Sequence, residues 1–349
     1  MYSNDVKRLR GSSRTALHAR RLRNFLVVAL ASCVACGEAN VTTCGECAPP
    51  EHADALCTAG ACDFKCIDGF SRVEDACIED VIEVEDETEM LSAGGDFTCG
   101  VKTDRTLACW GLSDDGRTTV PEGMFKNISA GTAHACAVRI DGTVACWGAN
   151  PAGQATAPEG TFTSVSASDW HSCGLKTDDT IFCWGLSDGE RTAAPEGTFK
   201  SLSAGDNHTC AIKMDGSVVC WGASLQFQPA PPAKVFVRIS AGMEHTCGVT
   251  ENGDAVCWGS NNLGQSMAPE GDFTSIGAGG LHSCGVKADG SVACWGYSEN
   301  ERTTPPAGLV LKSIAVGVAN NCGVKMDGTV VCWGYEYAGQ TMPPAGTFL

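Results

Sequence analysis

The sequence predicts an all-β protein: a seven-bladed β-propeller over residues 88–349, preceded by a small disulfide-rich module. A unit such as residues 134–148 recurs seven times, and successive copies lie 37 or, once, 38 residues apart. A fixed period of this size indicates a repeat architecture. Several short strand-like segments per repeat, turns rich in Gly and Pro, and the lack of any helical stretch favour a propeller of 37-residue blades.

The hairpin at the centre of each repeat is indicated by its cysteines and its turn. Each copy has two cysteines ten residues apart, separated by residues that alternate with period two. Residues 140–142 fit a three-residue loop with glycine at its left-handed position, and this register places the two cysteines opposite each other. Facing Cβ atoms about 4.5–5.5 Å apart are close to what a disulfide requires. We therefore expect seven bridges within blades: Cys99–Cys109, Cys136–Cys146, Cys173–Cys183, Cys210–Cys220, Cys247–Cys257, Cys284–Cys294 and Cys322–Cys332.

Two of the seven hairpin turns depart from this pattern. Arg105 and Asp179 replace the turn glycine in the first and third repeats. The tryptophan after each second cysteine is expected to pack between blades. Residues 346–349 match the segment that precedes a first strand in other repeats, so we expect residues 89–94 to complete the last blade and close the ring noncovalently.

Residues 1–32 have the features of a signal peptide of the lipoprotein type. Several arginines precede an apolar run at residues 25–32, which is too short to span a bilayer. Residues 30–33, Leu-Ala-Ser-Cys, are similar to the lipobox of bacterial lipoproteins, in which Cys33 becomes the acylated N-terminus. An ordinary secretory signal is the alternative. Acylation at Cys36 instead would leave an even number of other cysteines.

Residues 33–78 are expected to form a cysteine-rich, EGF-like module. The segment has little apolar periodicity and cannot bury a core, so we expect disulfides to hold it together. Its end, residues 66–70, resembles that of an epidermal-growth-factor-like module. A zinc site is the alternative, because residues 44–47 have the ligand spacing Cys-x-x-Cys. Residues 79–87 are an acidic linker, or in part an added strand of the first or last blade.

The charge balance excludes one class of partner. The chain has 24 basic and 41 acidic residues, for a net charge of −17. Without residues 1–32, which hold seven of the basic and one of the acidic side chains, the balance is 17 to 40. Phosphate backbones would repel such a body, so we expect no nucleic acid partner.

The repeat resembles a known family. Ser-Ala-Gly-x-x-His-x-Cys followed by Asp-Gly and Trp-Gly is similar to the repeat of the regulator of chromosome condensation propellers. The short period and the connection from Gly264-Gln265 to Pro269 look more like the bacterial β-lactamase-inhibitor branch of that superfamily. The resemblance implies a seven-bladed ring that grips a protein partner with loops on one face. The cysteine pair in every hairpin departs from the family pattern.

Catalytic and metal chemistry find little support in the sequence. A histidine stands two residues before the first cysteine in five repeats, at His134, His171, His208, His245 and His282. A metal ladder would need further converging ligands, so we expect these side chains to anchor the Ser-Ala-Gly turn through hydrogen bonds to the backbone, and we expect no metal and no cofactor. Nucleophile elbows, phosphate loops and metalloprotease motifs are absent from the sequence. We therefore assign no catalytic residue.

The positions that vary between repeats are the candidate binding residues. One ring precedes the histidine position and includes Phe97, Asp169, Trp170, Asp206, Asn207, Met243, Glu244 and Leu281. Trp170 has the character of an interface anchor, and a packed loop residue is its alternative reading. A second ring follows Trp-Gly and includes residues 225–227, Tyr297, Tyr335 and Tyr337. We prefer the first ring on the family resemblance.

The predicted function is extracellular binding of a protein or glycan by one face of the propeller. We expect an exported monomer on the outer membrane or cell surface that touches the membrane only through its lipid anchor, or otherwise a secreted or periplasmic protein. The alternative is an extracellular propeller enzyme such as a polysaccharide lyase or hydrolase. Acidic residues gathered at the mouth of the central channel would favour catalysis, and aromatic residues spread over one rim would favour binding.

Overall fold

The computed structural model describes residues 53–58, 61–66, 70–73, 76–79, 90–223 and 230–349. The predicted signal peptide, Cys33, most of the cysteine-rich module and the acidic linker lie outside these residues. The chain divides into two units, Met1–Val84 and Glu85–Leu349. In the first unit, β1 (Ala53–Thr58) pairs with β2 (Ala61–Cys66), and β3 (Phe70–Val73) pairs with β4 (Ala76–Glu79). No helix among the described residues is long and apolar enough to cross a membrane.

The second unit consists of seven antiparallel three-stranded sheets, which confirms the predicted all-β propeller. We number the blades one to seven in chain order. Short 3₁₀ turns, η2 (Asp114–Gly116), η3 (Asp188–Glu190) and η5 (Glu299–Glu301), follow blades one, three and six. The strands are β5 (Leu91–Ala93), β6 (Phe97–Val101) and β7 (Leu107–Gly111); β8 (Phe125–Ala130), β9 (His134–Arg139) and β10 (Val144–Gly148); β11 (Phe162–Ala167), β12 (His171–Lys176) and β13 (Ile181–Gly185); β14 (Phe199–Ala204), β15 (His208–Lys213) and β16 (Val218–Gly222); β17 (Phe236–Ala241), β18 (His245–Thr250) and β19 (Ala255–Gly259); β20 (Phe273–Ala278), β21 (His282–Lys287) and β22 (Val292–Gly296); β23 (Leu311–Val316), β24 (Asn320–Lys325) and β25 (Val330–Gly334).

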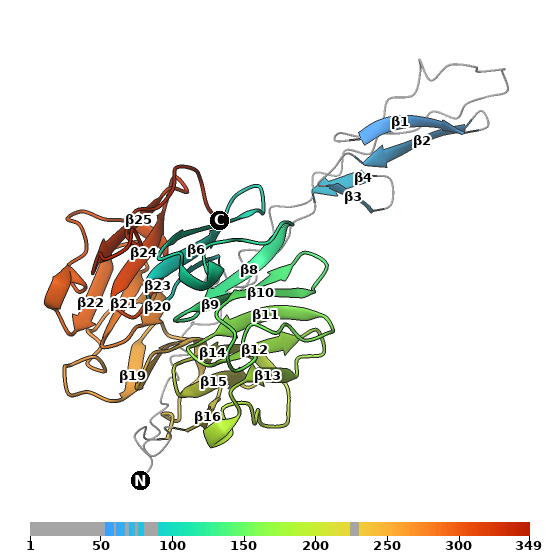
Figure 1. The fold of residues 1–349 in the computed structure, drawn as a ribbon. Coiled ribbons are helices and arrows are strands. Elements are labelled where there is room, and N and C mark those ends of the chain that lie inside the picture. Colours follow the sequence, from blue (N-terminus) through green and yellow to red (C-terminus); the bar gives the residue numbers. More distant parts are fainter. Residues whose placement is uncertain (1–52, 59–60, 67–69, 74–75, 80–89, 224–229) are drawn as a thin grey trace, which may run out of the picture. The chain divides into compact units, whose positions relative to one another are not determined.

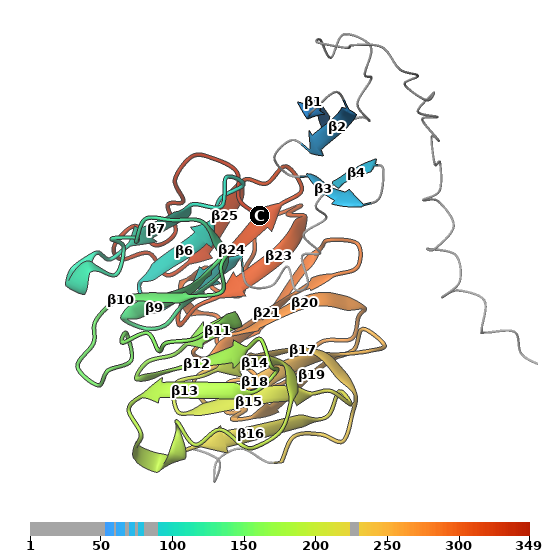
Figure 2. The ribbon, with the colours of Figure 1, turned by 90° about the vertical axis from the view of Figure 1, so that its right-hand side faces the viewer.

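The blades follow one another around a ring. Blade seven, in red, lies beside blade one in both views (Figures 1 and 2), and β23 and β24 both contact β5. The first strand of every blade lines the central channel. Because neighbouring strands of a blade run antiparallel, their ends and connecting loops lie on two opposite faces of the ring. We call the face where first strands end the loop face, and the face with the turns between second and third strands the hairpin face.

The hairpin register predicted from the cysteines is confirmed in all seven blades. Cys136 pairs with Cys146, for example, and each pair forms a disulfide, with S–S distances from 1.96 to 2.08 Å. Arg105 and Asp179 adopt the left-handed conformation of the glycines they replace, with φ of 67° and 64°. The ten-residue spacing therefore fixes the turn geometry even where the residue is unfavourable for it.

Ring closure differs from our expectation in one respect. The last blade is complete without residues 89–94, and β5 belongs to blade one. The two ends of the domain meet in that first blade, because Phe348 pairs with Lys102 and the Leu349 N–H donates to the Val101 carbonyl. Phe348 is buried against Trp110 with ring centroids 5.8 Å apart. The first strand of blade one is thus assembled from both ends of the domain, and the predicted noncovalent joining is correct.

Each blade buries one aromatic or leucine side chain at the start of its first strand. Phe162, for instance, is fully buried and lies edge-on to Trp184 of its own blade. Trp184 also belongs to a core cluster with Cys136 and Val138 of the preceding blade, as expected for a tryptophan packed between blades. The core is therefore a ring of similar small clusters rather than one central mass, typical of a repeat that packs on its neighbours.

A belt of serine hydroxyls joins neighbouring first strands. The serine of the Ser-Ala-Gly segment accepts a hydrogen bond from the next blade's alanine N–H at 2.9 Å, as from Ala130 to Ser92 and from Ala167 to Ser129. The same bond recurs at three further interfaces. Between blades six and seven, Gly277 replaces the serine and Val316 replaces the alanine. A Cβ atom at Gly277 would lie 2.5 Å from Val316 Cγ2, so the two exchanges compensate each other.

This compensation gives a stability prediction. Gly277→Ser alone should destabilise the propeller by about 1–3 kcal/mol, because the added side chain collides with Val316. Val316→Ala alone should cost about 1 kcal/mol through lost packing. The double variant should recover most of both losses, because it restores the serine–alanine pair of the other interfaces. Urea unfolding of all four proteins gives the coupling free energy, and simple additivity would contradict the compensation.

Candidate functional site

The described residues of both rings lie on the loop face, and residues 225–227 of the second ring lie outside the residues that the structure describes. The first ring occupies the turn between the first and second strands of each blade. The residue after Trp-Gly, where the second ring begins, donates its backbone N–H to the carbonyl of a first-ring residue, as from Leu186 to Trp170 and from Tyr297 to Leu281. The two candidate rings are therefore the inner and outer parts of one surface rather than alternatives on different faces.

Seven of the eight predicted ring residues occupy this surface. Trp170 and Glu244 are exposed, Trp170 at 41%, and the others are half-buried: Asp169, Asp206, Asn207, Met243 and Leu281. The prediction that Phe97 belongs to the ring is wrong. This residue begins β6 at the position of the histidines, and it is fully buried in a cluster with Ala135. Asp96, half-buried, holds the ring position in blade one, as counting back from Cys99 shows.

Three carboxylates gather at one sector of the loop face, in blades three to five. Burial, followed by the charges of Asp169 and Glu244, raises the pKa of Asp206 to about 6. Burial also raises the pKa of Asp169, against hydrogen bonds from Trp170 and Thr132 and the charge of Arg191. A carboxyl group whose charged form is disfavoured gains most from a positive partner, so this acidic sector favours a cationic ligand.

Arg191 is a buried cation next to the acidic sector: it binds Asn207, and its charge acts on Asp169. It follows η3, is 9% exposed, and donates to the Asp188 carbonyl and, at 2.6 Å, to Asn207 Oδ1. It also forms an ion pair with Asp188. Arg191 stands where Gln154 and Gln265 stand in other repeats, so the exchange for arginine adds a buried charge that fixes Asn207 beside the carboxylates.

The channel mouth itself is narrow. Its lining consists mainly of the Ala-Gly segments with Thr132, Asp206, Met243 and Val318, and it encloses about 70 Å³. Small-molecule sites usually enclose about 300–1,000 Å³. The acidic sector therefore offers a surface on which a partner can rest rather than a cavity that encloses a substrate.

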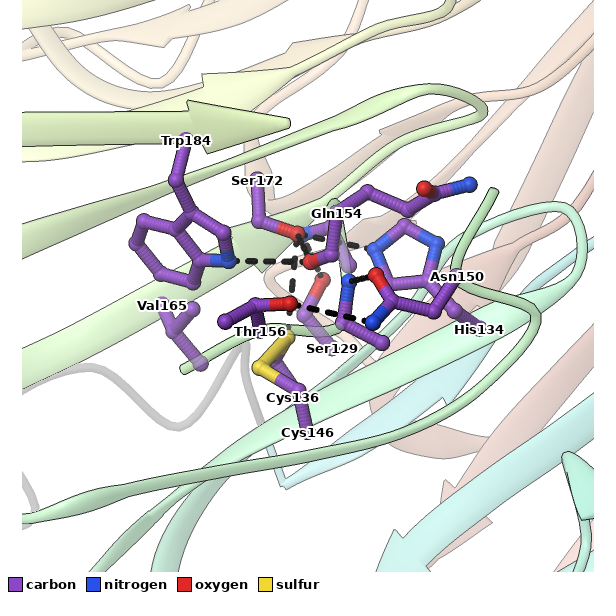
Figure 3. Close-up of a disulfide and its surroundings, with 12 residues drawn as sticks. Ser129, His134, Cys136, Cys146, Asn150, Gln154, Thr156, Val165, Ser172 and Trp184 are labelled. Carbon is purple, nitrogen blue, oxygen red and sulfur yellow. Dashed lines mark hydrogen bonds between the residues drawn. A yellow bond between two sulfur atoms is a disulfide. The ribbon is translucent and has the colours of Figure 1, made fainter. Parts of the chain in front are cut away.

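A second inter-blade belt contains the histidines. His134 Nε2 lies 2.8 Å from Ser172 Oγ of the next blade, and that hydroxyl donates to the Gln154 carbonyl at 3.0 Å (Figure 3). Trp184 Nε1 donates to the same carbonyl at 2.9 Å, and the Cys136–Cys146 bridge lies beside the hydroxyl. Because the hydroxyl donates to the carbonyl, it accepts from His134, which is thereby held as the neutral tautomer protonated on Nε2.

The belt corrects our expectation for the histidine side chains. They bond hydroxyl or amide groups of the next blade rather than the backbone of their own turn, and no three potential metal ligands converge among the residues the structure describes. The remaining contacts are His171–Thr209, His208–Thr246, His245–Ser283 and His282–Asn321. In blade seven Asn320 replaces the histidine and donates to Thr98 of blade one, and only Phe97 of blade one lacks a polar group.

Fold and surface together define a class: a disulfide-bridged repeat propeller whose chemistry varies on one face. Five repeats match the family model of the regulator of chromosome condensation (RCC1) repeat, over residues 125–154, 162–189, 199–228, 236–265 and 273–301. The chain belongs to the RCC1-like propeller superfamily. Comparison with curated protein sequences gives no match.

Solved structures show the same fold. The CRINKLY WD40 ectodomain of the Arabidopsis thaliana receptor kinase ACR4 is 28% identical, with a TM-score of 0.63 over 73% of this chain and 98% of its own. The ectodomain of the Physcomitrella patens receptor kinase CR4 is 24% identical, with a TM-score of 0.63 over 71% and 73%. Prp20p of Saccharomyces cerevisiae, described with its binding to Gsp1p and histones, is 16% identical, with a TM-score of 0.54 over 65% and 80%.

The histidine belt predicts acid sensitivity. Burial lowers the pKa of His134, His208 and His282 to about 4 and of His171 and His245 to about 3. The unfolded chain, with pKa values near 6.5, binds more protons below that pH, so stability is lost as pH falls from about 6.5 to 4. His208→Asn, which copies Asn320, should reduce the dependence by about 1.4 kcal/mol per pH unit. Urea unfolding at several pH values tests this, and an unchanged slope would contradict a neutral His208.

The raised pKa of Asp206 predicts that stability depends on pH in the opposite direction. The pKa of this carboxyl group in the folded protein, about 6, lies above the unfolded value of 3.8, so the folded state binds the extra proton and stability falls as pH rises from about 4 to 6. Asp206→Asn should remove this loss and stabilise the protein at pH 7.5 by on the order of 1 kcal/mol, allowing for partial solvent contact. Equal stability of variant and wild type at both pH 4 and pH 7.5 would show that Asp206 titrates normally.

Proposed function

We propose that this protein works outside the cytoplasm and binds a protein partner with its loop face. The observation that carries the proposal is the division of labour within each repeat. The cysteine pair recurs in every blade, and hydrogen bonds between blades recur at most interfaces, whereas the two rings differ from blade to blade. Rigid repeats that present variable loops on one surface are suited to recognition.

The chemistry of the loop face indicates the kind of partner. The exposed Trp170 follows Asp169 of the acidic sector and hydrogen-bonds to it, and an aromatic anchor beside charges is typical of a binding hot spot. Farther out, Met267, Tyr337 and Met342 are 67–69% exposed. A protein with a basic, partly apolar surface complements this combination better than an acidic glycan does.

The bridges support an extracellular setting. Seven disulfides within one domain persist in oxidising compartments. The ACR4 ectodomain is a comparable propeller in the extracellular part of a receptor kinase. We propose export by the signal at residues 1–32, acylation of Cys33 and a monomeric propeller held at the membrane surface by that anchor.

An extracellular hydrolase or lyase is the second proposal, because Asp206 lines the channel mouth and the charges of Asp169 and Glu244 act on it. The small volume there and the aromatic and methionine side chains on the outer ring favour binding over catalysis.

A partner-capture experiment tests the proposed face. The exported chain is immobilised and used to capture proteins from envelope and host extracts, and the affinity of each captured protein is then measured. Trp170→Ala should weaken binding at least about tenfold, as expected for a hot-spot aromatic. Phe182→Ala is the matched control, because Phe182 is exposed to a similar degree, 42%, on β13 away from the loop face. If both variants bind every partner as wild type does, the loop face is not the interface.

A further inference from the structure

The hairpin face carries a balanced ring of charges, with one exception. A basic residue is the last residue of the second strand, or in blade one directly follows it, in six blades: Lys102, Arg139, Lys176, Lys213, Lys287 and Lys325. Two residues later, each hairpin has an aspartate that accepts hydrogen bonds within its own turn, as Asp289 does from the Ser291 N–H at 2.9 Å and hydroxyl at 2.6 Å. These bonds lower the pKa of Asp289. The hairpin carboxylates therefore accept hydrogen bonds within their own turns.

The exception is a pocket between blades five, six and seven, whose lining has more cationic than acidic side chains. It encloses about 520 Å³, a size typical of small-ligand sites. Its lining includes Arg238, Lys287 and Lys312 against the single acid Asp289. In a chain of net charge −17, three cations around one pocket form a local reversal of charge.

One of these cations, Arg238, departs from the repeat. Arg238 stands where other blades have asparagine or serine, as at Asn127, Ser201 and Ser275. Lys312 forms no ion pair with any residue that the structure describes, and Lys287 lies over the Phe273 ring at 5.6 Å from its centroid. The lining of the pocket therefore has three cationic side chains and one carboxylate.

A buried hydroxyl in the same pocket also lacks a partner. Ser275 lines the pocket, is 3% exposed, and its Oγ has no hydrogen-bond partner among the described residues. A buried hydroxyl without a hydrogen bond destabilises the fold. A ligand oxygen would supply the acceptor, and Ser313 adds a second hydroxyl to the lining.

We propose that this pocket binds a tetrahedral oxyanion, a phosphate or sulfate group carried by a small ligand. Arg238, Lys287 and Lys312 supply the charge, and Ser275 donates to an oxyanion oxygen. Arginine and lysine around a phosphate or sulfate form charge-assisted hydrogen bonds, which are stronger than neutral ones. The site lies on the hairpin face, so it is independent of the proposed protein partner.

The test measures ligand binding without assuming a biological ligand. Sodium phosphate, sulfate and acetate are titrated at constant ionic strength into the full exported chain, and both the melting temperature and the heat of binding are recorded. We expect a saturable rise in melting temperature with phosphate or sulfate and none with acetate, since a ligand that binds only the folded state stabilises it. A response to phosphate alone or sulfate alone identifies which ester the natural ligand carries.

The variants separate a site from a general salt effect. Arg238→Gln and Lys312→Gln should each lower the affinity at least about tenfold. Lys200→Gln is the matched control, because Lys200 holds the position of Lys312 in blade four, outside the pocket, and Ser201→Ala controls for Ser275→Ala in the same way. Both anions also stabilise proteins unspecifically. A shift that does not saturate, or that is equal in Lys312→Gln and Lys200→Gln, would overturn the proposal.

Discussion

The hydrogen bond from a buried side chain of one blade to a hydroxyl or amide of the next is the interaction on which this propeller depends. Three strands make too small a sheet to bury much apolar surface, so each blade must be held in register by its neighbours. The Ser172 hydroxyl makes several of these contacts at once: it accepts from His134, donates to the Gln154 carbonyl and lies beside a disulfide. Losing the hydroxyl would leave His134 Nε2 buried without a partner, while the Gln154 carbonyl would keep the Trp184 N–H.

The disulfides complement this belt because they act within a blade. Each closes a loop worth roughly 3 kcal/mol on the chain-entropy model, less whatever the turn already contributes. The bridge fixes the second and third strands, and the belts fix one blade against the next. Neither uses the loop face, whose side chains are therefore free to differ from repeat to repeat. This separation explains how Asp206 can hold a raised pKa without the ring losing its order.

Much of this architecture follows from the sequence because the cysteines act as a ruler. Their spacing predicts the hairpin register and the number of blades, and the structure adds that the turns are left-handed even at Arg105 and Asp179, where the sequence lacks the turn glycine. The cysteine spacing also places Asp96 in the ring, whereas Phe97, predicted to lie in the ring, stands at the histidine position two residues before Cys99 and is buried in the core. That both rings share one face, and that His134 reaches into the next blade, depend on packing between repeats, which no single repeat encodes. The pocket at Arg238 likewise needs three blades side by side.

The seam at Phe348 has a consequence for biogenesis. Every hairpin can oxidise as soon as its own eleven residues emerge, because its two cysteines are close in sequence. Blade one, in contrast, needs residues from beyond blade seven, since Phe348 fills its core and Leu349 bonds to Val101. Formation of the disulfides is therefore local, while closure of the ring depends on the segment that follows blade seven. A chain interrupted before Phe348 would carry correct bridges and still lack a closed ring.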